Sequence, residues 1–172
     1  MSLRGCHNSM DMFVGTARFL IVRLGVTYIA LPADGVRGVL TKEEAGDEQI
    51  VTATGIPYQP IGLAEQLSLT VDLSGFEMRT VLYSNGHSQG AIRVEQVVGL
   101  TDVERKDCFP LPPQFQCDER NWFAGMMLHQ DQLVLILNPS WALGEAFDVI
   151  PISVGQTKQT VEGTPTAVGG RC

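Results

Sequence analysis

The sequence lacks a long apolar run and carries little charge. No stretch approaches the roughly 20 apolar residues that span a bilayer, and residues 1–15 contain no uninterrupted apolar core of a secretory signal. Charged residues make up 18% of the chain, and the net charge is -7. A mildly acidic surface repels phosphate backbones and anionic lipid. We therefore expect a cytoplasmic protein that inserts into no membrane and binds no nucleic acid.

Cysteine is also scarce. The four cysteines, at positions 6, 108, 117 and 172, match no metal-binding spacing. A chain of 172 residues with 44% hydrophobic content can bury a stable core without disulfide bonds, so we expect free thiols. Cys108 and Cys117 flank a proline-rich loop, and a redox or metal site there is the alternative.

Signatures of catalysis are missing. The sequence has no phosphate-binding loop, no dinucleotide-binding glycine motif, no zinc-protease motif and no nucleophile elbow. His7, His87 and His129 have no carboxylate or thiol at metal-ligand spacing within their own elements. The acidic stretch 42–48 lacks the ligand pattern of a calcium loop and is expected to be a solvated loop. We therefore predict that the protein is not an enzyme and has no catalytic, metal or cofactor site.

What the sequence does contain is a series of short β-branched segments separated by Gly, Asn and Pro, which is typical of strands. Three hairpins are predicted, pairing residues 19–24 with 27–31, 78–83 with 91–95, and 122–128 with 133–137. Asn85-Gly86 supplies the reversal of the second hairpin, and a four-residue connection at 129–132 joins the third.

Irregularities of these segments carry further predictions. Pro32 ends its strand because it lacks a backbone donor, and a bulge at Gly38 reconciles Val36 with Val39. Val97-Val98 breaks the alternation of its strand and requires a bend. Short helices are expected within 61–67 and after Asn138-Pro139.

Many short strands and almost no long amphipathic helix indicate an all-β barrel or sandwich. Residues 1–17 and 144–172 read as an N-terminal tail and a flexible C-terminal tail, because they show little periodicity or few large apolar residues. A single domain at 18–143 lies between them.

Several segments resemble the CheW family. Residues 90–103 are similar to the pattern of that family's second lobe, with Glu95 where the family usually has Asp. Residues 111–113 resemble its proline-bearing loop, and residues 125–127 with 133–138 resemble its last two strands. The opening segments 19–24 and 28–39 are also similar. The resemblance covers about Phe19 to Leu143, and it lies in the order and spacing of these segments together.

This resemblance implies two five-stranded SH3-like β-barrel subdomains with short helices. It also implies a non-catalytic adaptor that couples chemoreceptors to a CheA-type histidine kinase. In the family, one surface meets the cytoplasmic hairpin tip of a chemoreceptor and another meets the regulatory domain of the kinase. Val36 and Val39 match the receptor-side segment, with Leu63 nearby. For all three residues the alternative is ordinary core packing.

Two departures from the family pattern stand out. The N-L-R-G segment is missing, with Gly62 at the position of the Asp that follows it, and Gly38 replaces an acidic residue. In typical members that acidic residue and the missing Arg form a charge pair, and losing both leaves no unpaired charge. The departures indicate a divergent sensory array. The alternatives are a coupling protein for pilus motility or another non-flagellar pathway, and a thiol redox switch on a β-barrel at Cys108 and Cys117.

Overall fold

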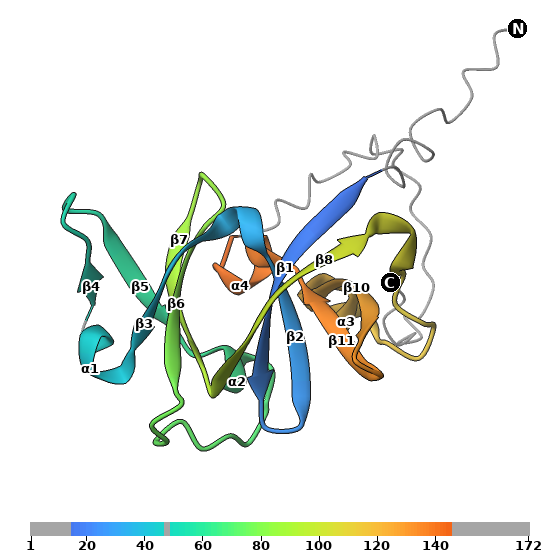
Figure 1. Cartoon of the computed structure of the whole chain (residues 1–172), viewed down its shortest axis with the longest axis horizontal. Helices are drawn as coiled ribbons and strands as arrows, with labels where there is room; N and C mark the ends of the chain where they lie inside the picture. Colours follow the sequence, from blue (N-terminus) through green and yellow to red (C-terminus); the bar gives the residue numbers. More distant parts are fainter. Residues whose placement is uncertain (1–14, 47–48, 146–172) are drawn as a thin grey trace, which may run out of the picture.

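The chain folds into two β-sheets that lie side by side (Figure 1). The computed structural model describes residues 15–46 and 49–145. The all-β class is confirmed, with sheets of six and five strands instead of five in each. The sixth strand is a two-residue segment, Cys108–Phe109, that pairs with the neighbouring hairpin.

The six-stranded sheet joins the two ends of the described chain in the order β8-β1-β2-β11-β10-β9. Its strands are β1 (Thr16–Leu24), β2 (Thr27–Pro32), β8 (Gln96–Glu104), β9 (Cys108–Phe109), β10 (Phe123–His129) and β11 (Gln132–Leu137). β2 and β11 pair in parallel, so a strand near the start of the sequence lies beside one near the end.

The five-stranded sheet comes from the middle of the chain, in the order β3-β6-β7-β5-β4. Its strands are β3 (Val36–Thr41), β4 (Ile50–Val51), β5 (Pro57–Ile61), β6 (Arg79–Ser84) and β7 (Gln89–Val94). The described residues also form short helices: η2 (Ala33–Gly35), α1 (Lys42–Ala45), α2 (Leu63–Gln66), η3 (Arg105–Asp107), α3 (Cys117–Trp122) and α4 (Pro139–Ala142).

The three predicted hairpins are confirmed, and their turns differ in kind. Leu24 pairs with Thr27 across a two-residue turn that begins with Gly25 at φ +62°. In the β6–β7 turn, the Asn85 side-chain oxygen accepts the backbone N–H groups of His87 and Ser88. The β10–β11 connection has two residues, Gln130 and Asp131, and not the four expected.

The predicted irregularities are also confirmed. β2 ends at Pro32. β3 has the expected bulge, but one residue earlier: Val36 pairs with Tyr83 and Gly38 with Leu82, which leaves Arg37 as the additional residue. The β1–β8 register shifts where Ile21 pairs with Gly99 and Val22 pairs with Val97, which leaves Val98 as the additional residue. The short helices α2 and α4 form where they were expected.

Two local predictions are wrong. Part of the expected acidic loop is the helix α1, because Thr41 and Glu44 form a reciprocal capping box at its start; residues 47–48 lie outside the described residues. Trp122 ends α3 and does not open a strand. α3 has its own capping box, in which Glu119 accepts the backbone N–H of Gln116 at 2.9 Å.

Both predicted tails include residues that the structure orders. β1 begins at Thr16, inside the range 1–17, and the Glu145 carboxylate accepts the side-chain amide N–H of Asn85 at 2.8 Å. Residues 1–14 and 146–172 lie outside the described residues.

The core has three parts. The largest cluster, which we call the interlobe core, joins residues of β1, β2 and β11 to residues of β5, β6, β7, α2 and α4. A second cluster is built within the six-stranded sheet around Phe19, Ile21, Met127 and Ile136. A third, smaller cluster is built around Tyr58, Leu82 and Ala91 of the five-stranded sheet. Since the interlobe core draws on both sheets, it fixes them against each other.

Candidate interaction surfaces

The strand β3 ends the five-stranded sheet and pairs with β6. An edge strand presents backbone N–H and C=O groups that can pair with another chain. Val39 lies on this strand with 41% of its surface exposed, directly opposite the fully buried Val81 of the interlobe core. Val36 is half-buried and packs against the same core. The edge of β3 is therefore an apolar border of the interlobe core that solvent reaches at Val39.

Leu63 does not belong to any surface. Its side chain is 0% exposed within the interlobe core, where α2 places it. In this fold Leu63 packs as a core residue, which agrees with the core alternative. The four-residue spacing of Leu63 and Leu67 predicted the helix correctly, but it carried no information on which side would be covered.

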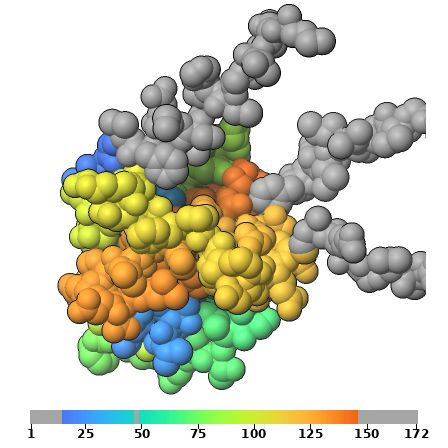
Figure 2. Space-filling model, turned by 90° about the vertical axis from the view of Figure 1, so that its right-hand side faces the viewer, coloured from blue at the N-terminus to red at the C-terminus, as the bar shows by residue number. Residues whose placement is uncertain are grey.

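A second apolar surface lies on the outer face of β9, β10 and β11. Leu128 and Leu133 form a cross-strand pair in which both side chains are exposed, at 65% and 53%. Met126, two residues along β10 from Leu128, pairs with Phe109, which is 46% exposed. Directly opposed residues and residues two apart share a face of a sheet. Figure 2 shows β10 and β11, in orange, uncovered at the molecular surface beside the blue β1–β2 hairpin.

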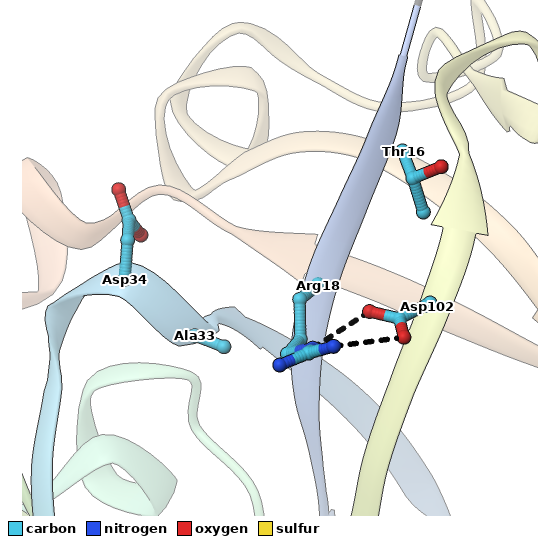
Figure 3. A pocket seen from close by; sticks show the side chains of 5 residues that line it. All are labelled: Thr16, Arg18, Ala33, Asp34 and Asp102. Atoms are coloured by element: carbon cyan, nitrogen blue, oxygen red, sulfur yellow. Dashed lines mark hydrogen bonds and ion pairs between the residues drawn. The ribbon is translucent and has the colours of Figure 1, made fainter.

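A broad polar pocket of about 610 Å³ opens between the start of β1, β8 and η2, and Figure 3 shows its lining. Arg18 holds Asp102 through two parallel hydrogen bonds, 2.7 Å from Nε to Oδ1 and 3.1 Å from Nη2 to Oδ2. These bonds lower the pKa of Asp102 and raise that of Arg18. Asp34 stands apart from the pair in Figure 3. The pair is cross-strand and exposed, so it stabilises the β1–β8 border and presents no activated group.

The two cysteines of the proline-rich segment differ in state. Cys108 is a free, half-buried thiol, and burial raises its pKa. Cys117 is disulfide-bonded, so the expectation of free thiols is wrong for this residue. Cys108 and Cys117 are therefore not joined to each other. Because the thiolate is the reactive form, a raised pKa makes Cys108 a poor redox nucleophile. Cys6 and Cys172 lie outside the described residues.

Within residues 15–46 and 49–145, no three His, Cys, Asp or Glu side chains come together to hold a metal ion. His87 lies in the β6–β7 turn and His129 ends β10; His7 is outside the described residues. In the same part of the chain, every helix is too short or too polar to cross a membrane.

The sequence matches no protein-family model and no curated protein. The structure does match a solved one, the crystal structure of the scaffolding protein TtCheW from Thermoanaerobacter tengcongensis. The TM-score is 0.59 at 13% sequence identity, over 72% of this chain and 90% of that one. The fold is CheW-like. At this level of identity the likeness concerns the fold, which the segments resembling the family had indicated.

Within the CheW-like fold, the two glycines at family-variant positions have different surroundings. A Cβ added at Gly38 would meet the Leu82 side chain at 3.7 Å, an ordinary contact. A Cβ at Gly62 would lie 3.0 Å from the Glu65 carboxylate. Packing therefore allows a side chain at position 38, and an acidic one at position 62 would face a like charge. The lack of a side chain at position 38 is therefore not a packing requirement of the fold.

Glu95, the residue that replaces the family's usual Asp, has a structural role that the sequence did not reveal. Its carboxylate accepts the backbone N–H of Gly25 at 2.6 Å and the Arg23 guanidinium at 3.0 Å. Its own backbone N–H donates to the carbonyl of Arg23. The expected inward side chains of this segment, Ile92 and Val94, are buried. No local pattern signals the Glu95 contacts, because Glu95 and Gly25 are far apart in the sequence.

Proposed function

We propose that the protein is a non-catalytic adaptor that couples a chemoreceptor to a CheA-type histidine kinase. The observation that carries the proposal is the likeness of the fold, over 72% of this chain, to a scaffolding protein of the CheW type. The exposed apolar residues on β3 and on the β9–β11 face support it, since contiguous apolar surface is typical of protein–protein contacts. The partners are the regulatory domain of the kinase and the cytoplasmic tip of the receptor.

We assign the receptor-side contact to the edge of β3, with Val39 at its centre and Val36 beside it. Val39 combines exposure with a position on the strand that ends the five-stranded sheet, and with Gly38 at its centre β3 itself carries no carboxylate. An edge strand that exposes Val39 beside the cation Arg37 suits a partner that presents a strand or apolar side chains. Leu63 supports this surface from beneath as part of the core and does not touch the partner.

The test is a titration of the purified chain against the regulatory domain of a CheA-type kinase and against a receptor cytoplasmic fragment. We expect dissociation constants near the micromolar level, about -8 kcal/mol. Val39→Asp should weaken receptor binding at least about tenfold, or about 1.4 kcal/mol, and leave kinase binding unchanged.

Val26→Asp is the matched control, because Val26 is 96% exposed in the β1–β2 turn, away from β3. It makes the same change of charge and should leave both affinities unaltered. Failure of the unmodified chain to bind either partner would refute the adaptor function. Equal receptor binding by Val39→Asp and the unmodified chain would refute only the assignment of the receptor contact to β3, and not the adaptor function.

We further propose that this coupling takes place in the cytoplasm and that its output is chemotaxis. A pilus-based or other non-flagellar output would use the same two contacts. Deleting the gene and scoring swimming and surface motility separately distinguishes these outputs.

A further inference from the structure

Most cations in the described part of the chain are engaged within the fold, and Arg37 is not. Arg18, Arg23 and Lys106 hold carboxylates, Lys42, Arg79 and Arg120 donate to backbone carbonyls, and Arg93 also interacts with another residue. Among the same described residues, the side chains of Arg37 and Arg105 make no hydrogen bond or ion pair, and both residues are exposed. The guanidinium of Arg37 is therefore available to a partner.

The bulge in β3 places Arg37 beside a hollow that both sheets border. Arg37 is the additional residue of that bulge, and a bulge re-aims the side chain that it inserts. Its side chain lines a pocket of about 340 Å³ between η2, the β6–β7 turn and the start of α4. Pro32 of β2 and Tyr83 of β6 also line this pocket. A free cation thus lies at the junction of the two sheets, on the same strand as the exposed Val39.

The polar groups of this pocket favour an anion. The Tyr83 hydroxyl donates to the Pro32 carbonyl and brings no negative charge. The Ser84 oxygen accepts the backbone N–H of Gly86, so the Ser84 O–H can still donate to a ligand. Asp34 is the one carboxylate of the lining, and it makes no ion pair with Arg37 within the described residues. The guanidinium is therefore not neutralised by its own surroundings.

The spacing of Arg37 and Val39 defines what a partner must present. Two positions along a strand are separated by about 7 Å, and neighbours three or four positions apart on a helix lie about 5–6 Å from each other. A carboxylate and an apolar side chain that neighbour each other on one element of the partner can therefore reach Arg37 and Val39 together.

We propose that the receptor presents a carboxylate to Arg37, next to the apolar group that covers Val39. This inference rests on the proposed adaptor function and deepens its receptor contact. A guanidinium and a carboxylate form two parallel hydrogen bonds, which fixes the orientation of the partner as well as its position. The carboxylate enters the pocket between η2 and the β6–β7 turn, and Val39 supplies the apolar contact beside it.

The first test is a titration of Arg37→Gln against the receptor cytoplasmic fragment. We expect binding to weaken at least about tenfold, because the charge-assisted hydrogen bonds are lost. Binding to the kinase regulatory domain should be unchanged. Arg105→Gln is the matched control, since Arg105 is the other exposed arginine without a partner among the described residues and does not lie on β3. It removes the same charge and should leave receptor binding unaltered.

The second test identifies the carboxylate by charge reversal. Arg37→Glu is titrated against receptor fragments in which one Asp or Glu at a time is replaced by Lys. One of these fragments should bind Arg37→Glu at least about tenfold more tightly than the unmodified fragment does, because the ion pair is restored with opposite signs. Melting curves of each variant should match that of the unmodified chain, since the Arg37 side chain has no partner within the described fold.

The outcomes separate this inference from the adaptor function. Receptor binding by the unmodified chain together with equal binding by Arg37→Gln would overturn the inference and leave the adaptor function standing. Equal losses for Arg37→Gln and Arg105→Gln would reduce the effect to net charge, and the absence of any rescuing fragment would exclude a carboxylate as the partner group. Each of these results also overturns the inference. Failure of the unmodified chain to bind the receptor fragment would refute the receptor contact itself.

Discussion

Glu95 connects three parts of the chain through one carboxylate. It holds the β1–β2 turn at Gly25 and the end of β1 at Arg23, from the junction of β7 and β8. The Arg23–Glu95 pair is about 30% exposed, with side-chain values of 31% and 27%. A carboxylate that is partly shielded from water and holds a backbone N–H contributes more than an exposed ion pair.

We expect Glu95→Ala to lower the free energy of unfolding by about 1–3 kcal/mol, because the Gly25 N–H and the Arg23 guanidinium lose their acceptor. Urea denaturation measures the change. Glu104→Ala is the control, since its partner Lys106 and Glu104 itself are both more than 60% exposed. It should change stability by less than about 0.5 kcal/mol. Equal effects of the two substitutions would show that Glu95 does not hold the turn.

Tyr83 should make the free energy of unfolding decrease at alkaline pH. Its hydroxyl donates to the carbonyl of Pro32 at 2.9 Å, and burial, reinforced by Asp34, raises the pKa of Tyr83 well above its ordinary value. The unfolded chain releases this proton near pH 10, while the folded chain keeps it. The stabilisation is therefore complete below pH 10 and is lost as pH rises beyond it, by up to about 1.4 kcal/mol per pH unit.

Melting curves between pH 8 and pH 11.5 test this dependence. Tyr83→Phe should lower stability at pH 8 by about 1 kcal/mol through the lost hydrogen bond, and its decline above pH 10 should be shallower than that of the unmodified chain. Parallel declines for the two proteins would contradict a raised pKa at Tyr83.

At the scale of elements, the β10–β11 turn has the residues that suit its backbone conformation least among the three hairpin turns. Gln130 and Asp131 take φ values of +49° and +60°, as a type I′ turn requires, but neither is glycine. Asn85-Gly86, by contrast, marked its hairpin in the sequence. This explains why the position of the third hairpin was predicted correctly and its turn was not: Gln-Asp does not indicate a two-residue turn.

Replacing Gln130-Asp131 with Asn-Gly should raise the free energy of unfolding by about 0.5–1 kcal/mol, because these residues adopt positive φ at lower cost. Thermal and urea denaturation measure the gain. The control introduces the same Asn-Gly pair in place of Asp118-Glu119 in α3. There the glycine should destabilise the helix. No gain at 130–131 would show that the type I′ turn is not strained there.

Two helices missed from the sequence had usable signals. Thr41 and Glu44 have the spacing of a capping box, as do Gln116 and Glu119. The charge of the 42–48 stretch concealed the first signal, and the apolar run from Trp122 to Leu128 concealed the end of the second helix. Cap residues were more informative than composition at both positions.

At the scale of the whole molecule, the interlobe core makes the two sheets one unit. Leu63, Val81 and Ile92 from the middle of the chain pack in the same cluster as Leu24 and Leu137 from its two ends. Neither sheet can lose its structure without exposing the buried face of the other. The molecule should therefore unfold in a single transition.

We expect Leu63→Ala to lower the free energy of unfolding by about 2–5 kcal/mol while preserving one transition. Trp122 and Trp141 stack with ring centroids 5.5 Å apart, so tryptophan fluorescence reports their surroundings and far-UV circular dichroism reports the strands. The two signals should change together. Leu100→Ala, at a 64% exposed site, is the control and should have little effect. Separate transitions would mean that the sheets unfold independently.

The sequence by itself determined the all-β class, the three hairpins, the bulges in β3 and β8 and the positions of α2 and α4, because alternation, turn residues and caps act between near neighbours in the chain. Tertiary structure decided the parallel pairings of β2 with β11 and of β5 with β7, which place distant strands together. Through those pairings it buried Leu63, left Val39 at an open edge and made Glu95 the support of a distant turn. Burial depends on which distant strand covers a side chain, and no local pattern contains that information.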